Sequence, residues 1–147
     1  EEIEAADTIR HPKFYFFDSG IQRALSDELN IGMHSRTYQY GHAFEQFVIN
    51  EINRLQSYYR KDYRLSYILT GAGVEIDLII ERPGLKRAAV EIKSTATIAK
   101  SDLRGLLSLG KDIPNCELFC LSKDEVPKII EGVHCLPWQA GLVELGL

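Results

Sequence analysis

The sequence lacks the features that define several broad classes of protein. Its 147 residues contain no run of about 20 apolar residues that could span a membrane, and no basic start followed by an apolar stretch that would indicate a secretory signal. The three cysteines are an odd number in a chain without an export signal, which disfavours a disulfide framework. We therefore expect a cytoplasmic protein that does not associate with a membrane.

An excess of positive charge is also lacking, since the formal net charge at pH 7 is −4. This charge argues against nucleic-acid binding through bulk positive charge, although a local basic patch remains compatible with it. The sequence shows neither repeats nor low-complexity tracts, and a hydrophobic content of 45% fits one globular domain. Because the chain starts at Glu1 within an acidic run, we expect a piece of a longer protein, with residues 1–10 left from a preceding linker and 11–147 forming the domain.

The order of apolar patterns predicts an α/β fold around a mixed sheet. The two strands joined at Pro83-Gly84 must be antiparallel, because the connection is a tight turn. The predicted elements are a strand at 13–17, a helix starting near Asp18 or Ser19, a turn-rich segment at 30–37, a long amphipathic helix at 41–56, strands at 64–69, 74–81 and 87–93, a helix from about 101 that Gly110 ends, strands at 117–122 and 133–136, and a closing helix after Pro137.

The predicted hairpin carries acids within its apolar runs. Alternation puts Val74, Ile76, Leu78 and Ile80 on one face, and Glu75 and Asp77 on the other. A turn centred on Gly84 would place Asp77 opposite Glu91 and Glu75 opposite Lys93. Because like charges directly opposite each other destabilise a sheet, a divalent cation held by oxygen ligands is the simplest partner for Asp77 and Glu91.

The long helix offers a third acid. At about 100° per residue, Glu45 projects between Val48 and Ile49, inside the apolar arc that should meet the sheet. Glu51 also falls within this arc, so the projection alone does not single out Glu45. Its place near the helix start, after Gly41, favours it, because a side chain there can reach the rim of a sheet.

Glu45, Asp77, Glu91 and Lys93 together suit phosphodiester hydrolysis. Carboxylates hold Mg²⁺ or Mn²⁺, the metal activates a water and neutralises charge on the phosphate, and a lysine orients or deprotonates the nucleophile. The alternative is a surface hairpin of solvated acids with a Glu75–Lys93 ion pair worth well under 1 kcal/mol, as is usual for exposed pairs. The spacing alone leaves both interpretations open.

The same residues resemble a known signature. Asp77, thirteen further residues and then Glu91-Ile92-Lys93 resemble the D-x(n)-(D/E)-x-K pattern of the PD-(D/E)XK nuclease superfamily, with Ile76 where the superfamily name has proline. In order and spacing, four segments are similar to the nuclease-like domain that follows the ATPase module in a family of bacterial and archaeal AAA-type ATPases. They are KFYFFDSGI (13–21), GHAFEQFVINEI (41–52), GVEIDLII (73–80) and VEIKST (90–95).

This resemblance covers the chain from about His11, and it implies a restriction-endonuclease-like core of one helix, three strands, a helix and a strand. It further implies that Asp77, Glu91 and the backbone carbonyl of Ile92 ligate the metal. Glu45 would complete the site directly or through water, and Lys93 would serve the nucleophile or the transition state. The implied partners are DNA and an N-terminal ATPase module of the same longer chain.

Several other signals have plainer explanations. GLLSLGKD (105–112) has the spacing of a phosphate-binding P-loop, but Asp112 replaces the Ser or Thr that would hold Mg²⁺, and the interior is a leucine stripe. His134-Cys135 lacks a second ligand pair at zinc spacing, and Cys116 and Cys120 fit one apolar strand. His34 and His42 could approach a phosphate, but exposed histidines at a helix end are the simpler interpretation.

Four basic residues could form a rim that contacts DNA phosphates: Arg36, Lys100, Arg104 and Lys123. Lys100 and Arg104, one turn apart, equally fit a solvated helix face. The sequence thus predicts a metal-dependent nuclease domain acting on DNA. The alternatives are a catalytically silent domain that binds DNA or docks the ATPase to a partner, and a homo-oligomerisation domain acting through Tyr38, Tyr40 or residues 14–17.

Overall fold

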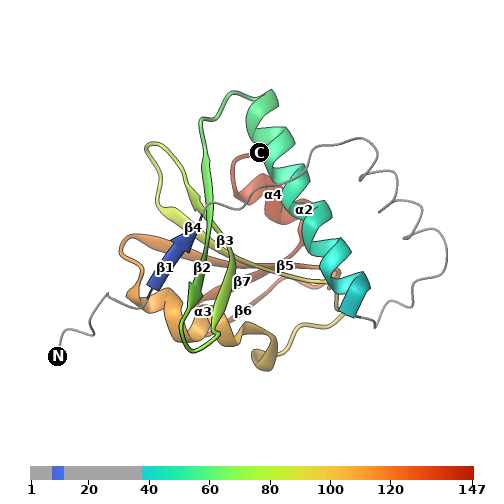
Figure 1. Ribbon diagram of the computed structural model, residues 1–147. Helices are drawn as coiled ribbons and strands as arrows, with labels where there is room; N and C mark the ends of the chain where they lie inside the picture. The colour runs from blue at the N-terminus through green and yellow to red at the C-terminus, as the bar shows by residue number, and fades with distance from the viewer. Residues whose placement is uncertain (1–7, 12–37) are drawn as a thin grey trace.

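A computed structural model of the protein describes residues 8–11 and 38–147 (Figure 1). The predicted strand at 13–17, the helix after Asp18 or Ser19 and the turn-rich segment at 30–37 lie outside these residues, as do His34 and Arg36.

The described residues form one mixed sheet of seven strands, which confirms the predicted α/β class. The first four strands in the sheet order are antiparallel neighbours, the fourth, fifth and sixth positions run parallel, and the last strand is again antiparallel. In spatial order the strands are β1 (Thr8–His11), β2 (Arg64–Thr70), β3 (Glu75–Glu81), β4 (Arg87–Lys93), β5 (Cys116–Ser122), β7 (Val133–Pro137) and β6 (Lys128–Ile130).

Helices cover both faces of this sheet (Figure 1). On one face lie α2 (Tyr38–Tyr58) and α4 (Trp138–Glu144), whose apolar side chains share a core with alternate residues of β3, β4 and β5. On the other face lies α3 (Arg104–Leu109), flanked by the short 3₁₀ helices η2 (Lys100–Leu103) and η3 (Gly110–Asp112). The two cores, one on each face, make β4 a central strand with little exposed surface.

The long helix forms because its apolar residues recur at helical spacing. Phe44, Val48, Ile49 and Ile52 are buried against the sheet, whereas Phe47 remains partly exposed. The helix begins three residues earlier and ends two residues later than predicted. Near its start, a Cβ added to Gly41 would lie only 3.6 Å from Ser94 Oγ, so this end of α2 lies beside the carboxyl end of β4.

The β3–β4 hairpin closes as predicted. Gly84 has a positive φ of 77°, which glycine adopts without steric cost, and the Leu85 N–H donates to the Arg82 carbonyl at 3.0 Å. The ladder pairs Leu78 with Val90 and continues to Ile80 and Ala88. This is the predicted register, because each pair of residue numbers is centred on Gly84.

Two details of the predicted hairpin are wrong. The ladder between β3 and β4 ends at Leu78 and Val90, so Asp77 and Glu91 are not a regular cross-strand pair, and Glu75 pairs with Leu69 of β2. The β2–β3 register also shifts between Ser66 and Ile68. Because of this irregularity, Ile76 packs in the core under α3, while Leu78 and Ile80 pack under α2.

Other differences concern short elements. The helix expected from about residue 101 to Gly110 is split into η2, α3 and η3, and the strand β6 at the sheet edge was not predicted. Thr8–His11 pairs with β2, although residues 1–10 were assigned to a preceding linker. In the part of the chain that the structure describes, no helix is long and apolar enough to cross a membrane.

Candidate functional site

Asp77 lies where β3 and β4 separate. Immediately beyond the last ladder pair, its Oδ2 accepts a hydrogen bond from the Ile92 N–H at 2.9 Å. The side chain thus takes a position that a backbone carbonyl would occupy in a continuing ladder. It ties the start of β3 to the carboxyl end of β4, and its carboxylate stays close to the residues that follow Val90.

Glu91 is a buried acid on the face of the sheet that α3 covers. Its neighbours Val90 and Ile92 pack under α2, so alternation along β4 directs Glu91 to the other side. Only 4% of Glu91 is exposed, and a Cβ added to Gly105 of α3 would lie 3.4 Å from Glu91 Oε1. A glycine at 105 therefore lets the helix approach this carboxyl group closely.

The surroundings of Glu91 disfavour its ionised form. Burial, and after it the negative charge of Asp77, raise the pKa of Glu91 to about 8, and the Lys93 ammonium offsets only part of this effect. At pH 7, without another cation, the carboxyl group holds a proton. A further cation beside Glu91 would lower the pKa of its carboxyl group and so favour the ionised form.

Lys93 completes the group on the same face of β4. Its Nζ lies 3.4 Å from Glu91 Oε2, and about a third of its side chain is exposed. Burial alone would lower the pKa of Lys93, but the carboxylates of Glu91 and Asp77 outweigh burial and the net pKa is raised. Lys93 is therefore a cation at neutral pH, suited to pairing with negative charge and unsuited to accepting a proton.

Glu45 lies on α2, outside the strands that carry this group. It is half-buried on α2, one turn beyond Gly41 and on the same side of the helix, so it lies toward the rim at the end of β4 as expected. However, α2 packs on the face opposite to Glu91. Among residues 8–11 and 38–147, no three His, Cys, Asp or Glu side chains are close enough to hold a metal ion together.

The residues present fit a divalent cation bound by two carboxylates. Mg²⁺ retains several waters and needs only one or two carboxylates from a protein, and the Lys93 ammonium offsets only part of the rise in the pKa of Glu91. The role of Glu45 at this site stays a prediction. The role of the Ile92 carbonyl stays a prediction, because the contact that the structure shows there is made by the Ile92 N–H.

Two of the four predicted DNA-contacting residues, Arg104 and Lys123, lie around this end of the sheet. Lys93 pairs with Ser122 across the parallel β4 and β5, so Lys123 follows at the same rim. Its ammonium donates a hydrogen bond to the Tyr40 hydroxyl and lies 4.5 Å from the centroid of the Tyr40 ring. Lys100 is exposed and forms an ion pair with Glu131 at 2.5 Å, and Arg104 is exposed beside Gly105.

The loop after β4 is held by a buried acid that sequence reasoning missed. Asp124 Oδ2 accepts from the Ile98 N–H at 2.9 Å and lies 2.7 Å from Lys128 Nζ. Lys128, with the N–H groups of Ile98 and Val126, lowers the pKa of Asp124 to about 2. This carboxylate fixes the loop that leads from Lys93 to η2. The local signal was Asp124 two residues after the end of a strand, which is common in turns.

The structure also shows the surroundings of the P-loop-like segment and of the cysteines and histidines that lie in the described residues. Residues 105–112 are helical, so they form no glycine-rich phosphate loop. Cys116 and Cys120 lie in β5, and His134 is exposed on β7 with its ring 5.7 Å from that of Phe119. His42 is exposed near the start of α2, and Tyr38, with 89% of its surface exposed, stacks on it.

The fold and the site define a mixed α/β domain with a buried carboxyl group, a second carboxylate and a lysine at the point where two central strands separate. The chain belongs to the family described as a domain of unknown function (DUF4143), which matches residues 40–140. Domains of this family are often found with AAA ATPases. No curated protein and no solved structure matches the chain.

Proposed function

We propose that this domain hydrolyses phosphodiester bonds of DNA with Mg²⁺ or Mn²⁺ bound at Asp77 and Glu91, as a restriction-endonuclease-like member of the PD-(D/E)XK superfamily. The observation that carries the proposal is the burial of Glu91 beside Asp77. A buried carboxyl group with a raised pKa costs stability above neutral pH unless a cation balances it. Perturbed groups of this kind cluster at functional sites.

The metal, when bound, would lower the pKa of a coordinated water and neutralise charge on the phosphate. Asp77 orients the end of β4 through the Ile92 N–H, which fixes where Glu91 and Lys93 follow. Lys93 remains protonated, so its role is to pair with negative charge on the phosphate rather than to act as a general base. Arg104 and Lys123 supply cations around the same rim for the DNA backbone, and Lys100 is a further exposed cation on η2.

The order of elements agrees with this assignment. Helix α2, strands β2, β3 and β4, helix α3 and strand β5 follow each other as one helix, three strands, a helix and a strand. The association of the family with AAA ATPases supports the idea that an ATPase module in the same longer chain delivers or moves the substrate. Both the nuclease-like assignment and the role of the ATPase module are proposals that the fold and the family support.

A second candidate function is supported by a specific observation. Glu91 is almost fully covered, and Glu45 packs on the other side of the sheet, so the described residues hold two close carboxylates and not three. A catalytically silent domain that binds DNA, or that docks the ATPase to a partner protein, would retain this core without cutting. The two candidates differ in whether metal binding and cleavage occur.

The test is cleavage of labelled single-stranded, duplex and branched DNA with Mg²⁺ or Mn²⁺, with and without a chelator. Asp77→Asn keeps the shape and can still accept from the Ile92 N–H, but removes the charge. Asp112→Asn, on exposed η3, is the matched control. We expect cleavage that the chelator abolishes, that D77N lowers at least 100-fold and that D112N leaves unchanged, as for loss of a group that stabilises the transition state.

The opposite result is equally specific. If the protein cuts none of the substrates and binds no Mn²⁺ while its fold is intact, the silent domain becomes the better account. Cleavage that D77N and D112N leave at the same rate would show that the activity belongs to another site.

A further inference from the structure

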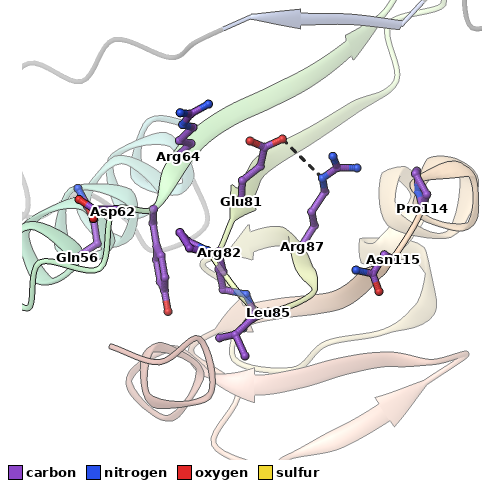
Figure 2. Close-up of a pocket in the computed structure, with 11 residues that line it drawn as sticks. Gln56, Asp62, Arg64, Glu81, Arg82, Leu85, Arg87, Pro114 and Asn115 are labelled. Carbon is purple, nitrogen blue, oxygen red and sulfur yellow. Dashed lines mark ion pairs between the residues drawn. The ribbon is translucent and has the colours of Figure 1, made fainter.

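A cavity lies at the amino end of β4, away from the candidate metal site. It has a volume of about 1010 Å³, and its walls come from the end of α2, the start of β2, the β3–β4 turn and the segment before β5 (Figure 2). Arg87 at its rim and Lys93 at the candidate metal site are six residues apart on one strand, roughly 20 Å at the usual rise of a strand. The two sites are therefore separate.

Five charged side chains line the cavity: the cations Arg64, Arg82 and Arg87 and the acids Asp62 and Glu81. Three further cations, Arg60, Lys61 and Lys86, are exposed and neighbour these residues in the sequence, so cations outnumber acids at this end of an acidic chain. A concave surface with one predominant sign of charge raises the local concentration of oppositely charged ligands. The ligand class favoured by this end of the molecule is anionic.

The three arginines that line the cavity are not equivalent. Arg82 is a buried part of the wall, with its Nε donating to the Lys86 carbonyl at 2.9 Å and its NH2 donating to Glu117 at 2.6 Å. Arg64 forms no ion pair with any other described residue, and Arg87 only approaches Glu81 at 3.6 Å. Figure 2 shows Glu81 between Arg64 and Arg87, so that two guanidinium groups have one carboxylate between them.

Apolar and amide groups complete the lining. Pro83, Leu85 and Pro114 present exposed apolar surface, and Gln56 and Asn115 bring amides to the cavity. Guanidinium groups bind phosphate with two parallel hydrogen bonds, and small ligands are held by apolar walls with a few polar groups that orient them. A planar, partly apolar body attached to a phosphate matches this lining.

We propose that the cavity binds a nucleoside phosphate, with the phosphate on Arg64 and Arg87 and the base against Pro83, Leu85 and Pro114. The same chemistry is offered by a free nucleotide and by the terminal nucleotide of a DNA strand. This site is independent of metal binding at Asp77 and Glu91, and it does not require that the domain cuts DNA.

The test is a titration of the ¹⁵N-labelled protein followed by NMR, with three probes: deoxyadenosine 5′-monophosphate, a 5′-phosphorylated single-stranded pentanucleotide and inorganic phosphate. We expect shifts of the Arg64 and Arg87 Nε–H signals and of the Asn115 amide. Binding by the mononucleotide assigns the site to free nucleotides, whereas binding by the pentanucleotide alone assigns it to DNA ends. Inorganic phosphate should bind at least tenfold more weakly than the better of these two.

Single substitutions sharpen this test. Arg64→Gln and Arg87→Gln should each weaken binding about tenfold or more, since each removes a charged hydrogen-bond donor. Glu81→Gln should strengthen it severalfold, because it removes the carboxylate that competes with the phosphate for Arg87. Arg54→Gln, on the exposed face of α2 where Arg54 pairs with Glu51, is the matched control and should change affinity less than twofold.

The proposal is overturned if none of the probes shifts the cavity signals, or if Arg64→Gln binds as tightly as the unchanged protein. It is also overturned if inorganic phosphate binds as well as the nucleotide, because the apolar wall then has no role. Asp77→Asn should leave the affinity unchanged, so failure at the metal site and failure at this cavity give different results.

Discussion

The two ends of β4 bury charge in opposite ways. At the amino end, the guanidinium group of Arg82 is 3% exposed and is matched by Glu117 and a backbone carbonyl. At the carboxyl end, Glu91 is as deeply buried, but its nearest partners are another acid and a lysine at 3.4 Å. The first charge is matched by partners within the protein, whereas the second group is kept protonated at neutral pH, because burial and Asp77 raise the pKa of Glu91.

This comparison separates structural charges from functional ones. A buried charge with short, well-directed partners reports on the fold. A buried acid whose pKa is raised by burial and by a neighbouring carboxylate is a candidate functional group, because perturbed groups of this kind cluster at functional sites. The predictions below test the two ends in turn, from the largest expected effect to the smallest.

The largest effect concerns Glu91 and pH. Because its pKa is about 8 in the folded protein and 4.5 in the unfolded chain, the folded state binds more protons between these values. The free energy of unfolding should therefore fall as pH rises from 5 to 8, by about 3 kcal/mol at 1.36 kcal/mol per pH unit. Urea unfolding of the metal-free protein and of Glu91→Gln, each at pH 5 and at pH 8, measures how much Glu91 contributes to this change in the free energy of unfolding.

The Gln variant should lack that part of the pH dependence and should be the more stable protein at pH 8. Equal pH dependence in the two proteins would show that Glu91 ionises normally and that its burial has no electrostatic cost.

The close approach of α3 gives the next effect. A Cβ at Gly105 would lie 2.1 Å from the Glu75 carbonyl oxygen, a contact that requires the helix or the strand to shift. Gly105→Ala should lower the free energy of unfolding by about 2 to 3 kcal/mol, as for overpacking of a core. Gly71→Ala is the control, since no atom lies within 4 Å of its added Cβ. Thermal unfolding of both variants suffices, and equal melting temperatures would contradict the close packing of α3 over Glu91.

At the amino end of β4, the two partners of the ion pair should differ in importance. Glu117→Ala leaves the buried Arg82 cation with only the Lys86 carbonyl, and should lower the free energy of unfolding by about 2 kcal/mol. Arg82→Met leaves Glu117, which is 42% exposed and can be solvated, so the cost should be smaller. Denaturant unfolding at pH 7 measures both. A larger loss of stability in Arg82→Met than in Glu117→Ala would contradict this account, because it would show that an unpaired Arg82 cation costs less than an unpaired Glu117.

The smallest effect concerns the C-terminal segment. The Tyr63 hydroxyl donates to the Leu145 carbonyl at 2.9 Å in a buried contact. Tyr63→Phe should lower the free energy of unfolding by about 1 kcal/mol, the usual net value of one hydrogen bond. A denaturant midpoint unchanged by this substitution would show that water replaces the contact.

Much of the fold could be predicted from the sequence, because the strands and α2 have strong periodicity and the hairpin has Gly84 at its centre. The register followed from that turn and agrees with the observed pairs. Strand β6 escaped detection because three residues at a sheet edge carry little pattern. The face of Ile76 was wrong because a register shift between neighbouring strands leaves no mark in the apolar alternation of β3.

The candidate site was predictable in part. Asp77, Glu91 and Lys93 lie together as expected, since two of them share a strand and the third is fixed by the hairpin register. The side of the sheet on which α2 packs relative to Glu91 could not be read from the helix, because an amphipathic pattern shows which face of the helix is buried but not which face of the sheet it covers. The arginine cavity was missed because its residues come from four separate segments.

The most direct test of the central claim is calorimetric titration of the protein with Mn²⁺ at pH 7.5, beside Asp77→Asn and Glu91→Gln. The account predicts that the protein binds one Mn²⁺ and that each substitution weakens binding at least tenfold, because each removes one of two charged ligands. Absence of Mn²⁺ binding by the folded protein, or equal binding by both variants, would contradict the claim that Asp77 and Glu91 are placed together to hold a cation.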